Sequence, residues 1–155
     1  MSETENSQPQ FAIQRIYLKD LSFETPHTPH IFQSQGEGAV NVELDSSANR
    51  LAESVYEVVL SLTVTNKLAE KVAYLVEVRQ AGIFAISGFN EQDLNGMLHS
   101  FCPNILFPYV RESITSVVSK GSFPQLLLAP INFDAIYAQH LQKQQAAASD
   151  TQAVH

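Results

Sequence analysis

The residues best able to do covalent chemistry are Cys102 and His99, which lies three positions before it. On a helix this spacing places both side chains on one face, where an imidazole could activate a thiol for nucleophilic attack. Pro103 follows directly and disturbs regular helix geometry, and no third residue that would orient the imidazole is identifiable. We therefore expect Cys102 to be a small, buried apolar residue, and we predict that the protein is not an enzyme.

Two further patterns fall short of a functional site. His27 and His30 lie in a proline-containing loop, but a zinc site needs three or four ligands, so both are expected on the loop surface. The glycines Gly82, Gly88 and Gly96 are too far apart for a loop that cradles phosphate. No catalytic residue, metal ion or cofactor is predicted.

Charge and composition narrow the partners. The chain has 155 residues, 9 Lys and Arg against 16 Asp and Glu, and a net charge of -7. This acidic balance repels a phosphate backbone and attracts basic partners, so we expect no nucleic-acid partner. No apolar run is long enough to insert into a membrane. The first residues are acidic, unlike a secretory signal, and there is one cysteine, which together favour a cytoplasmic protein.

Alternating apolar and polar residues predict β-strands in the N-terminal half. Alternation in the first strand is imperfect, because Ile16 and Leu18 fall among the polar positions. The last two strands are expected to form a hairpin through Asn66–Glu70. The predicted strands are Phe11–Phe23, Ala39–Leu44, Val55–Thr65 and Lys71–Ile86.

The C-terminal half changes to a helical pattern. Asn90 is a good cap for a first helix and Gly121 a good stop for a second. Pro103 and Pro108 are expected to interrupt the helical segment, so that regular helix resumes at Tyr109. Strands first and helices last indicate an α+β fold with an antiparallel sheet.

A linker, residues 122–131, precedes a last helix that Asn132 can cap. Apolar residues in this helix follow a helical stripe. Beyond Gln145 the composition is low in complexity, and fraying is expected. The predicted organisation is a disordered arm over residues 1–10, one domain over residues 11–145 and a flexible tail over residues 146–155.

Apolar residues crowd the last third of the chain, including the run Leu126-Leu127-Leu128 in the linker. A loop with three leucines is difficult to bury completely, because its backbone polar groups would be buried too. Exposed apolar surface marks protein–protein contact. Periodicity alone favours a simple homo-oligomer interface over the alternative, an additional groove for client chains.

Several long blocks of the sequence resemble the SecB family of protein-export chaperones, and together they cover about residues 11–142. The matching blocks are Gln14–Pro26, Pro29–Gln33, Tyr56–Leu60, Gly82–Gly88, Cys102–Tyr109, Phe123–Leu126 and Asn132–Ala135. The sequence departs from the family pattern in two places. It lacks the tryptophan common in the loop Gln33–Ala39, and its tail after Gln145 has a single acid, Asp150.

The resemblance implies a four-stranded antiparallel sheet followed by two C-terminal helices, assembled as a dimer of dimers. It implies ATP-independent holding of unfolded preproteins in a translocation-competent state and their delivery to the SecA motor ATPase. The alternative is an oligomeric protein-interaction adaptor without client-holding activity. No cofactor is implied.

The resemblance also implies three sets of site residues. The set expected to bind SecA is Asp20, Glu24, Leu75 and Glu77. The set expected to bind client peptides is Val40, Val42, Leu44, Tyr109, Leu126, Phe133 and Tyr137. The set expected at the interface between dimers is Val76, Val78 and Gln80. Because side chains alternate along a strand, Leu75 and Glu77 should point opposite to Val76 and Val78.

Overall fold

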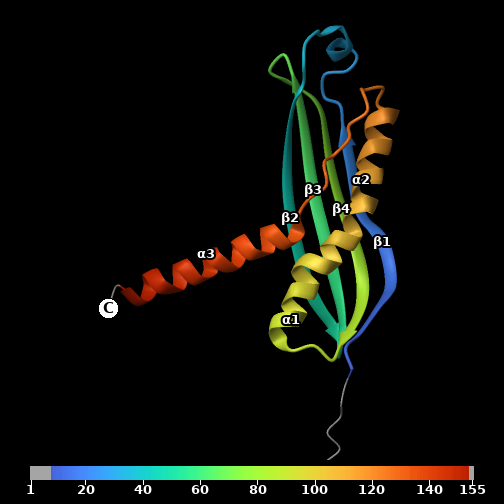
Figure 1. Cartoon of the computed structure of the whole chain (residues 1–155). Helices are drawn as coiled ribbons and strands as arrows, with labels where there is room; N and C mark the ends of the chain where they lie inside the picture. Colours follow the sequence, from blue (N-terminus) through green and yellow to red (C-terminus); the bar gives the residue numbers. More distant parts are fainter. Residues whose placement is uncertain (1–7, 154–155) are drawn as a thin grey trace, which may run out of the picture.

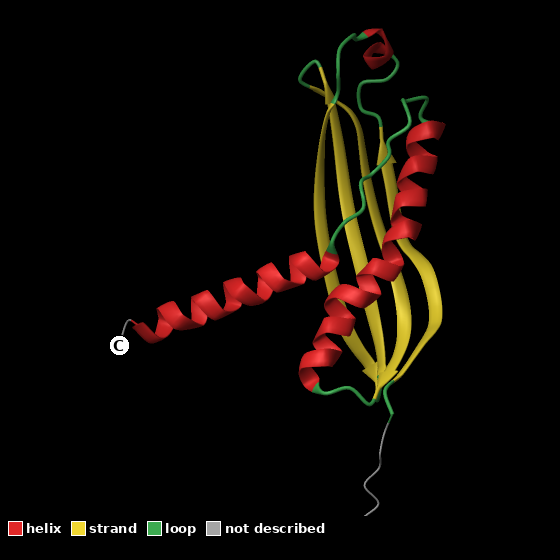
Figure 2. Cartoon of the chain, in the orientation of Figure 1, coloured by secondary structure: helices red, strands yellow, loops and turns green. Residues whose placement is uncertain are grey.

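The computed structural model describes residues 8–153 and contains one four-stranded antiparallel sheet with helices on one face (Figures 1 and 2). The α+β class and the four-stranded sheet are thereby confirmed. The predicted arm over residues 1–10 lies mostly outside the described residues. The strands are β1 (Gln10–Glu24), β2 (Ala39–Ala52), β3 (Val55–Leu68) and β4 (Lys71–Ser87), in the spatial order β1-β4-β3-β2. The helices are η1 (His30–Gln33), α1 (Glu91–Gly96), η2 (Met97–Phe101), α2 (Cys102–Lys120) and α3 (Phe133–Ala153).

Strand β1 alternates imperfectly because it contains two bulges. Its pairing with β4 skips Gln14 and Lys19, and an extra residue reverses the face to which the following side chains point. As a result Ile16 and Leu18 pair with Gly82 and Gln80 and share the helix-covered face. The prediction that these two residues sit on the polar side was wrong, since simple parity does not survive a bulge.

Strand β2 is much longer than predicted, because it continues past Leu44 to Ala52. Its second half is mostly polar and gave no apolar alternation, yet it pairs with β3 along its full length. The β3–β4 hairpin is also tighter than predicted. Its turn is only Ala69 and Glu70, which have φ angles of 52° and 66°, as a two-residue turn of type I′ requires.

The helical segment runs from Glu91 to Lys120 without a break. Its start is capped as predicted, because the Asn90 side chain accepts a hydrogen bond from the Asp93 N–H at 2.7 Å, and Gly121 follows its end. The predicted interruption by Pro103 and Pro108 was wrong. Pro103 lies in the first turn of α2, directly after the π-helical turn η2, where a widened turn accommodates the missing N–H.

The hydrophobic core lies between the sheet and α2, which packs on β3 and β4. The buried face of α2 presents apolar side chains at helical spacing, and burial of this stripe holds the proline-containing helix together. The fully buried side chains of α2 are Cys102, Leu106, Val110, Ile114 and Val118, and those of β4 facing them include Val76, Val78 and Phe84.

After Gly121 the chain returns along the sheet as an extended linker and enters α3, which projects away from the sheet (Figure 1). Asn132 caps α3 as predicted, accepting a hydrogen bond from the Ala135 N–H at 3.0 Å. The backbone of α3 is helical to Ala153, and the flexible tail expected over residues 146–155 stays a prediction. Alanines at positions 146–148 have high helix propensity, which explains the extension.

Candidate functional site

The open apolar surface on the helix side of the sheet is carried by β2. Val40, Val42 and Leu44 all point to this side, since Val42 and Leu44 pair with the core residues Val64 and Leu62 of β3. Helix α2 covers β3 and β4 but leaves β2 open, so Val40 and Val42 remain 44% and 41% exposed. Val40 and Val42 therefore lie on a part of β2 that α2 does not cover, while β2 also contacts η2.

The linker forms the next part of this surface. Leu126 and Leu128 pack against the core, whereas Leu127 between them is 75% exposed. The Thr115 hydroxyl of α2 donates a hydrogen bond to the Leu126 carbonyl at 3.2 Å, which fixes the linker to the helix. The expectation that the leucine run is incompletely buried is confirmed, because an extended backbone sends alternate side chains in opposite directions.

Contacts near its start fasten helix α3 to the body. Phe133 is 4% exposed and packs edge-on against Phe107 of α2, with ring centroids 6.0 Å apart. The Ser100 hydroxyl of η2 donates a hydrogen bond to Asp134. Tyr137 stacks on His99 at 5.9 Å.

Among the clefts that the described residues form beside this anchored part of α3, two have volumes of about 730 and 470 Å³. Phe133, Tyr137 and Leu141 line both of them. Residues of α1 and η2 complete the lining of the larger cleft. Leu44 of β2 and His99 of η2 contribute to the lining of the smaller cleft. The predicted client residues Leu44, Phe133 and Tyr137 thus meet in one cleft, and the exposed part of β2 leads into it.

The environment of Cys102 and His99 does not favour nucleophilic chemistry. Cys102 is fully buried, and burial raises the pKa of its thiol to about 12, so the thiolate is scarce at neutral pH. The expectation that Cys102 is a buried apolar residue is confirmed. Desolvation lowers the pKa of His99, and the nearby His140 lowers it further.

Within residues 8–153, no helix covers the opposite face of the sheet, and this face carries charged side chains (Figures 1 and 2). Glu24 pairs with Leu75, and Ser22, two residues before Glu24, pairs with Glu77. Asp20 lies further along β1 on the same face. The pairing therefore brings the four predicted SecA-binding residues together, and the expected opposition of Leu75 and Glu77 to Val76 and Val78 is confirmed by their burial.

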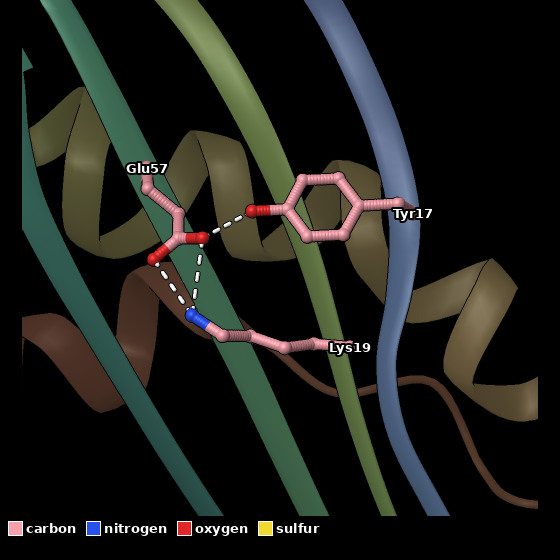
Figure 3. A network of polar contacts seen from close by, with 3 residues as sticks. All are labelled: Tyr17, Lys19 and Glu57. Carbon is pink, nitrogen blue, oxygen red and sulfur yellow. Dashed lines mark hydrogen bonds and ion pairs between the residues drawn. The ribbon is translucent and has the colours of Figure 1, made fainter.

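A polar network joins β1 to β3 across β4 on this bare face (Figure 3). The Tyr17 hydroxyl of β1 donates a hydrogen bond to Glu57 of β3, and Lys19 Nζ lies 3.0 and 3.1 Å from the two Glu57 carboxylate oxygens. The hydrogen bond to Glu57, followed by burial, raises the pKa of Tyr17 to about 12. The same hydrogen bond and the one from Lys19 lower the pKa of Glu57.

Four predicted site residues lie apart from these surfaces. Tyr109 is 47% exposed on α2 and lines neither cleft beside α3. The predicted dimer-interface residues Val76, Val78 and Gln80 are buried under the chain's own helices, with exposed fractions of 0%, 0% and 4%. Any influence of these three on assembly must pass through the helix that covers them.

Comparison with known proteins identifies the family. The family model for the preprotein translocase subunit SecB matches residues 4–144. The protein-export protein SecB of Marinobacter nauticus is 57% identical over 148 residues, covering 96% of this chain and 89% of the relative. The chain belongs to the SecB family. A second SecB, from Nitrosococcus oceani, is 57% identical over 145 residues, covering 92% of this chain and 88% of its own length.

The SecB fold is also found in a distant solved structure. The SecB-like chaperone of Mycobacterium tuberculosis, in complex with a ChAD peptide from the HigA1 antitoxin, superposes with a TM-score of 0.66 at 16% identity. The match covers 78% of this chain and 90% of the other. Separately, no helix within residues 8–153 is long and apolar enough to cross a membrane.

Sequence reasoning missed the part of the clefts that comes from α1 and η2. Phe89 and Met97 line the larger cleft, but no local pattern links them to residues about forty positions later. Ile136 and Leu141 belong to the apolar stripe expected in the last helix, but this stripe gave no signal for the cleft that it lines. The bridge from Tyr17 to Glu57 also had no local signal.

Proposed function

We propose that this protein is an ATP-independent chaperone that holds unfolded preproteins in a translocation-competent state and delivers them to the SecA motor ATPase. Its place in the SecB family, with 57% identity to protein-export proteins over most of the chain, supports this function. Because preproteins are held before their export, we propose that the protein acts in the cytoplasm.

The observation that carries the proposal is the exposed apolar strip Val40–Val42 running into the cleft formed by Leu44, Phe133 and Tyr137. An unfolded segment offers apolar side chains that are stabilised by leaving water. The strip on β2 and the adjoining cleft beside α3 offer apolar surface without a specific shape. They can therefore bind apolar side chains from many different client sequences. Leu126, fixed on the linker, supports the same surface.

The bare face of the sheet is the proposed surface for SecA. Asp20, Glu24 and Glu77 are exposed there around the half-buried Leu75. Such a surface suits a partner with basic residues around one apolar contact, and its attraction should weaken with salt. Because the client strip lies on the other face of the sheet, one molecule can bind both partners at once.

A homotetramer, a dimer of dimers, is the proposed assembly. Apolar side chains between 37% and 47% exposed gather on the helix side of the edge strand β1 and on the helical segment beside it: Ile13, Leu18, Leu21, Phe101 and Tyr109. This is the kind of surface that protein–protein contact covers. We propose that Val76, Val78 and Gln80 act on the assembly by positioning α2, and that Tyr109 serves the client surface, the assembly or both.

The direct test is suppression of aggregation without nucleotide. A reduced, unfolding substrate is followed by light scattering while the protein is added in increasing ratio. We expect suppression near one binding assembly per substrate chain, and no further effect of ATP. An adaptor without client-holding activity would leave the scattering unchanged, and that result would overturn the proposal.

A further inference from the structure

The bulge at Lys19 directs this side chain across the bare face of the sheet. Lys19 is the extra residue between Leu18 and Asp20 in the pairing of β1 with β4, and a bulge redirects the side chain that it carries. The ammonium group of Lys19 reaches over β4 to Glu57 on β3 (Figure 3). It therefore points away from its sequence neighbour Asp20, which belongs to the acidic surface.

The fit at Glu57 is specific. Lys19 Nζ contacts both carboxylate oxygens, at 3.0 and 3.1 Å, and the Tyr17 hydroxyl contacts one of them. Glu57 is only 12% exposed, and Lys19 is 38% exposed. Tyr17 pairs with Ala81 on the intervening strand, and such a small side chain leaves room for the bridge from β1 to β3. Glu57 of β3, itself hydrogen-bonded to Tyr17 of β1, thus holds the Lys19 ammonium group in one position.

We propose that Glu57 is a positioning residue for the SecA-binding surface. It binds Lys19 and so keeps a second positive charge away from Asp20, whose cross-strand neighbour on this face is already Arg79. Holding Lys19 therefore limits the positive charge that opposes a basic partner. This inference rests on the proposed function, because it presumes that SecA binds this face. Without Glu57 the lysine is free to turn along β1 towards Asp20 and to reduce the attraction.

A purely structural role for the network makes a different prediction. If Tyr17, Lys19 and Glu57 only fasten β1 to β3, then Tyr17→Phe and Glu57→Gln should affect SecA binding alike, through stability. If Glu57 acts by holding Lys19, Tyr17→Phe should leave SecA affinity unchanged, since the ion pair remains. Glu57→Gln should weaken binding because it releases the lysine.

The experiment measures SecA affinity of the full-length protein at low and at high salt. Glu57→Gln also removes one negative charge, so the matched control is Glu53→Gln, which removes an exposed carboxylate at the turn after β2. We expect Glu57→Gln to weaken binding about threefold more than Glu53→Gln at low salt, the size of a surface charge effect, and the difference to vanish at high salt. The double variant Lys19→Gln/Glu57→Gln should regain wild-type affinity.

The outcomes separate the inference from the proposed function. Equal affinities of Glu57→Gln and Glu53→Gln, or no recovery in the double variant, would overturn the role of Glu57 while SecA binding stands. Equal weakening by Tyr17→Phe and Glu57→Gln would do the same. Failure of the wild-type protein to bind SecA would overturn both the proposed SecA delivery and this inference.

Discussion

The two faces of β4 show how one strand serves two environments. Val76 and Val78 have no exposed surface and pack under α2, while Leu75 and Glu77 alternate with them on the bare face. Burial of the first pair stabilises the domain, and the second pair is available to a partner. The comparison teaches that neighbouring residues in one strand should respond differently to the same kind of substitution, one in folding and the other in binding.

The largest effect is expected from a charge on the covered face. Val76→Asp would place an unpaired carboxylate in the core, at a cost of about 3–5 kcal/mol, and should unfold the domain or displace α2, with loss of the assembly. The matched variant Glu77→Lys on the bare face should change stability by less than about 0.5 kcal/mol. Urea denaturation measures both, and similar midpoints would contradict the assignment of the two faces.

A smaller effect is expected at Cys102, also under α2. Cys102→Ser places a hydroxyl group among apolar side chains of the core. The variant should lower the free energy of unfolding by about 1–3 kcal/mol, the cost of a buried polar group without a hydrogen bond. Suppression of aggregation should persist at temperatures where the variant is folded. The native thiol, whose pKa is raised to about 12 by burial, should resist alkylation at pH 8 until urea is added. Loss of holding in a folded variant would point instead to cysteine chemistry.

The linker offers a comparison of the same kind within one tripeptide. Leu126 packs on the core and Leu127 is 75% exposed. A fully buried leucine contributes about 1.5–3 kcal/mol. Because Leu126 is only partly buried, Leu126→Ala should lower the free energy of unfolding by about 1 kcal/mol. Leu127→Ala should be neutral in thermal unfolding. Equal losses would show that the extended linker does not alternate as described.

The smallest effect concerns pH and the anchor of α3. Burial and His140 lower the pKa of His99 below its usual value of 6.5, so the folded state favours neutral His99. Its contribution to stability is complete above pH 6.5, declines as the pH falls towards the lowered pKa and then levels off. Thermal unfolding from pH 8 to 5.5 should show a weaker pH dependence in His99→Gln than in wild type. His27→Gln, in an exposed loop, is the control and should match wild type.

Much of the fold follows from the sequence, and the exceptions have physical causes. The helix caps at Asn90 and Asn132 were predictable, because each side-chain oxygen accepts a hydrogen bond from a backbone N–H only three residues later in the sequence. The bulges of β1 and the polar half of β2 were not, because pairing with a neighbouring strand determines both. The effect of the prolines in α2 was predicted wrongly, because burial of the apolar face of the helix outweighs the local cost of a missing backbone hydrogen bond.

The site followed the same division. The site positions on β1 and β2 came from the resemblance to the SecB family. Strand alternation predicted only that Leu75 and Glu77 of β4 point opposite to Val76 and Val78. The clefts beside α3 and the bridge from Lys19 to Glu57 could not be predicted, because they join residues far apart in the sequence. Tertiary contact rather than local pattern determines these features.

The most direct test of the account is a crossed titration of two variants with two partners. The triple variant with alanine at Val40, Val42 and Leu44 should weaken client binding at least tenfold and should keep SecA affinity. A tenfold loss needs only about 1.4 kcal/mol, whereas each methyl or methylene group removed from contact contributes up to about 0.8 kcal/mol. Glu77→Lys should weaken SecA binding and keep client affinity. Loss of both affinities in either variant, or of neither, would contradict the assignment of clients and SecA to opposite faces of the sheet.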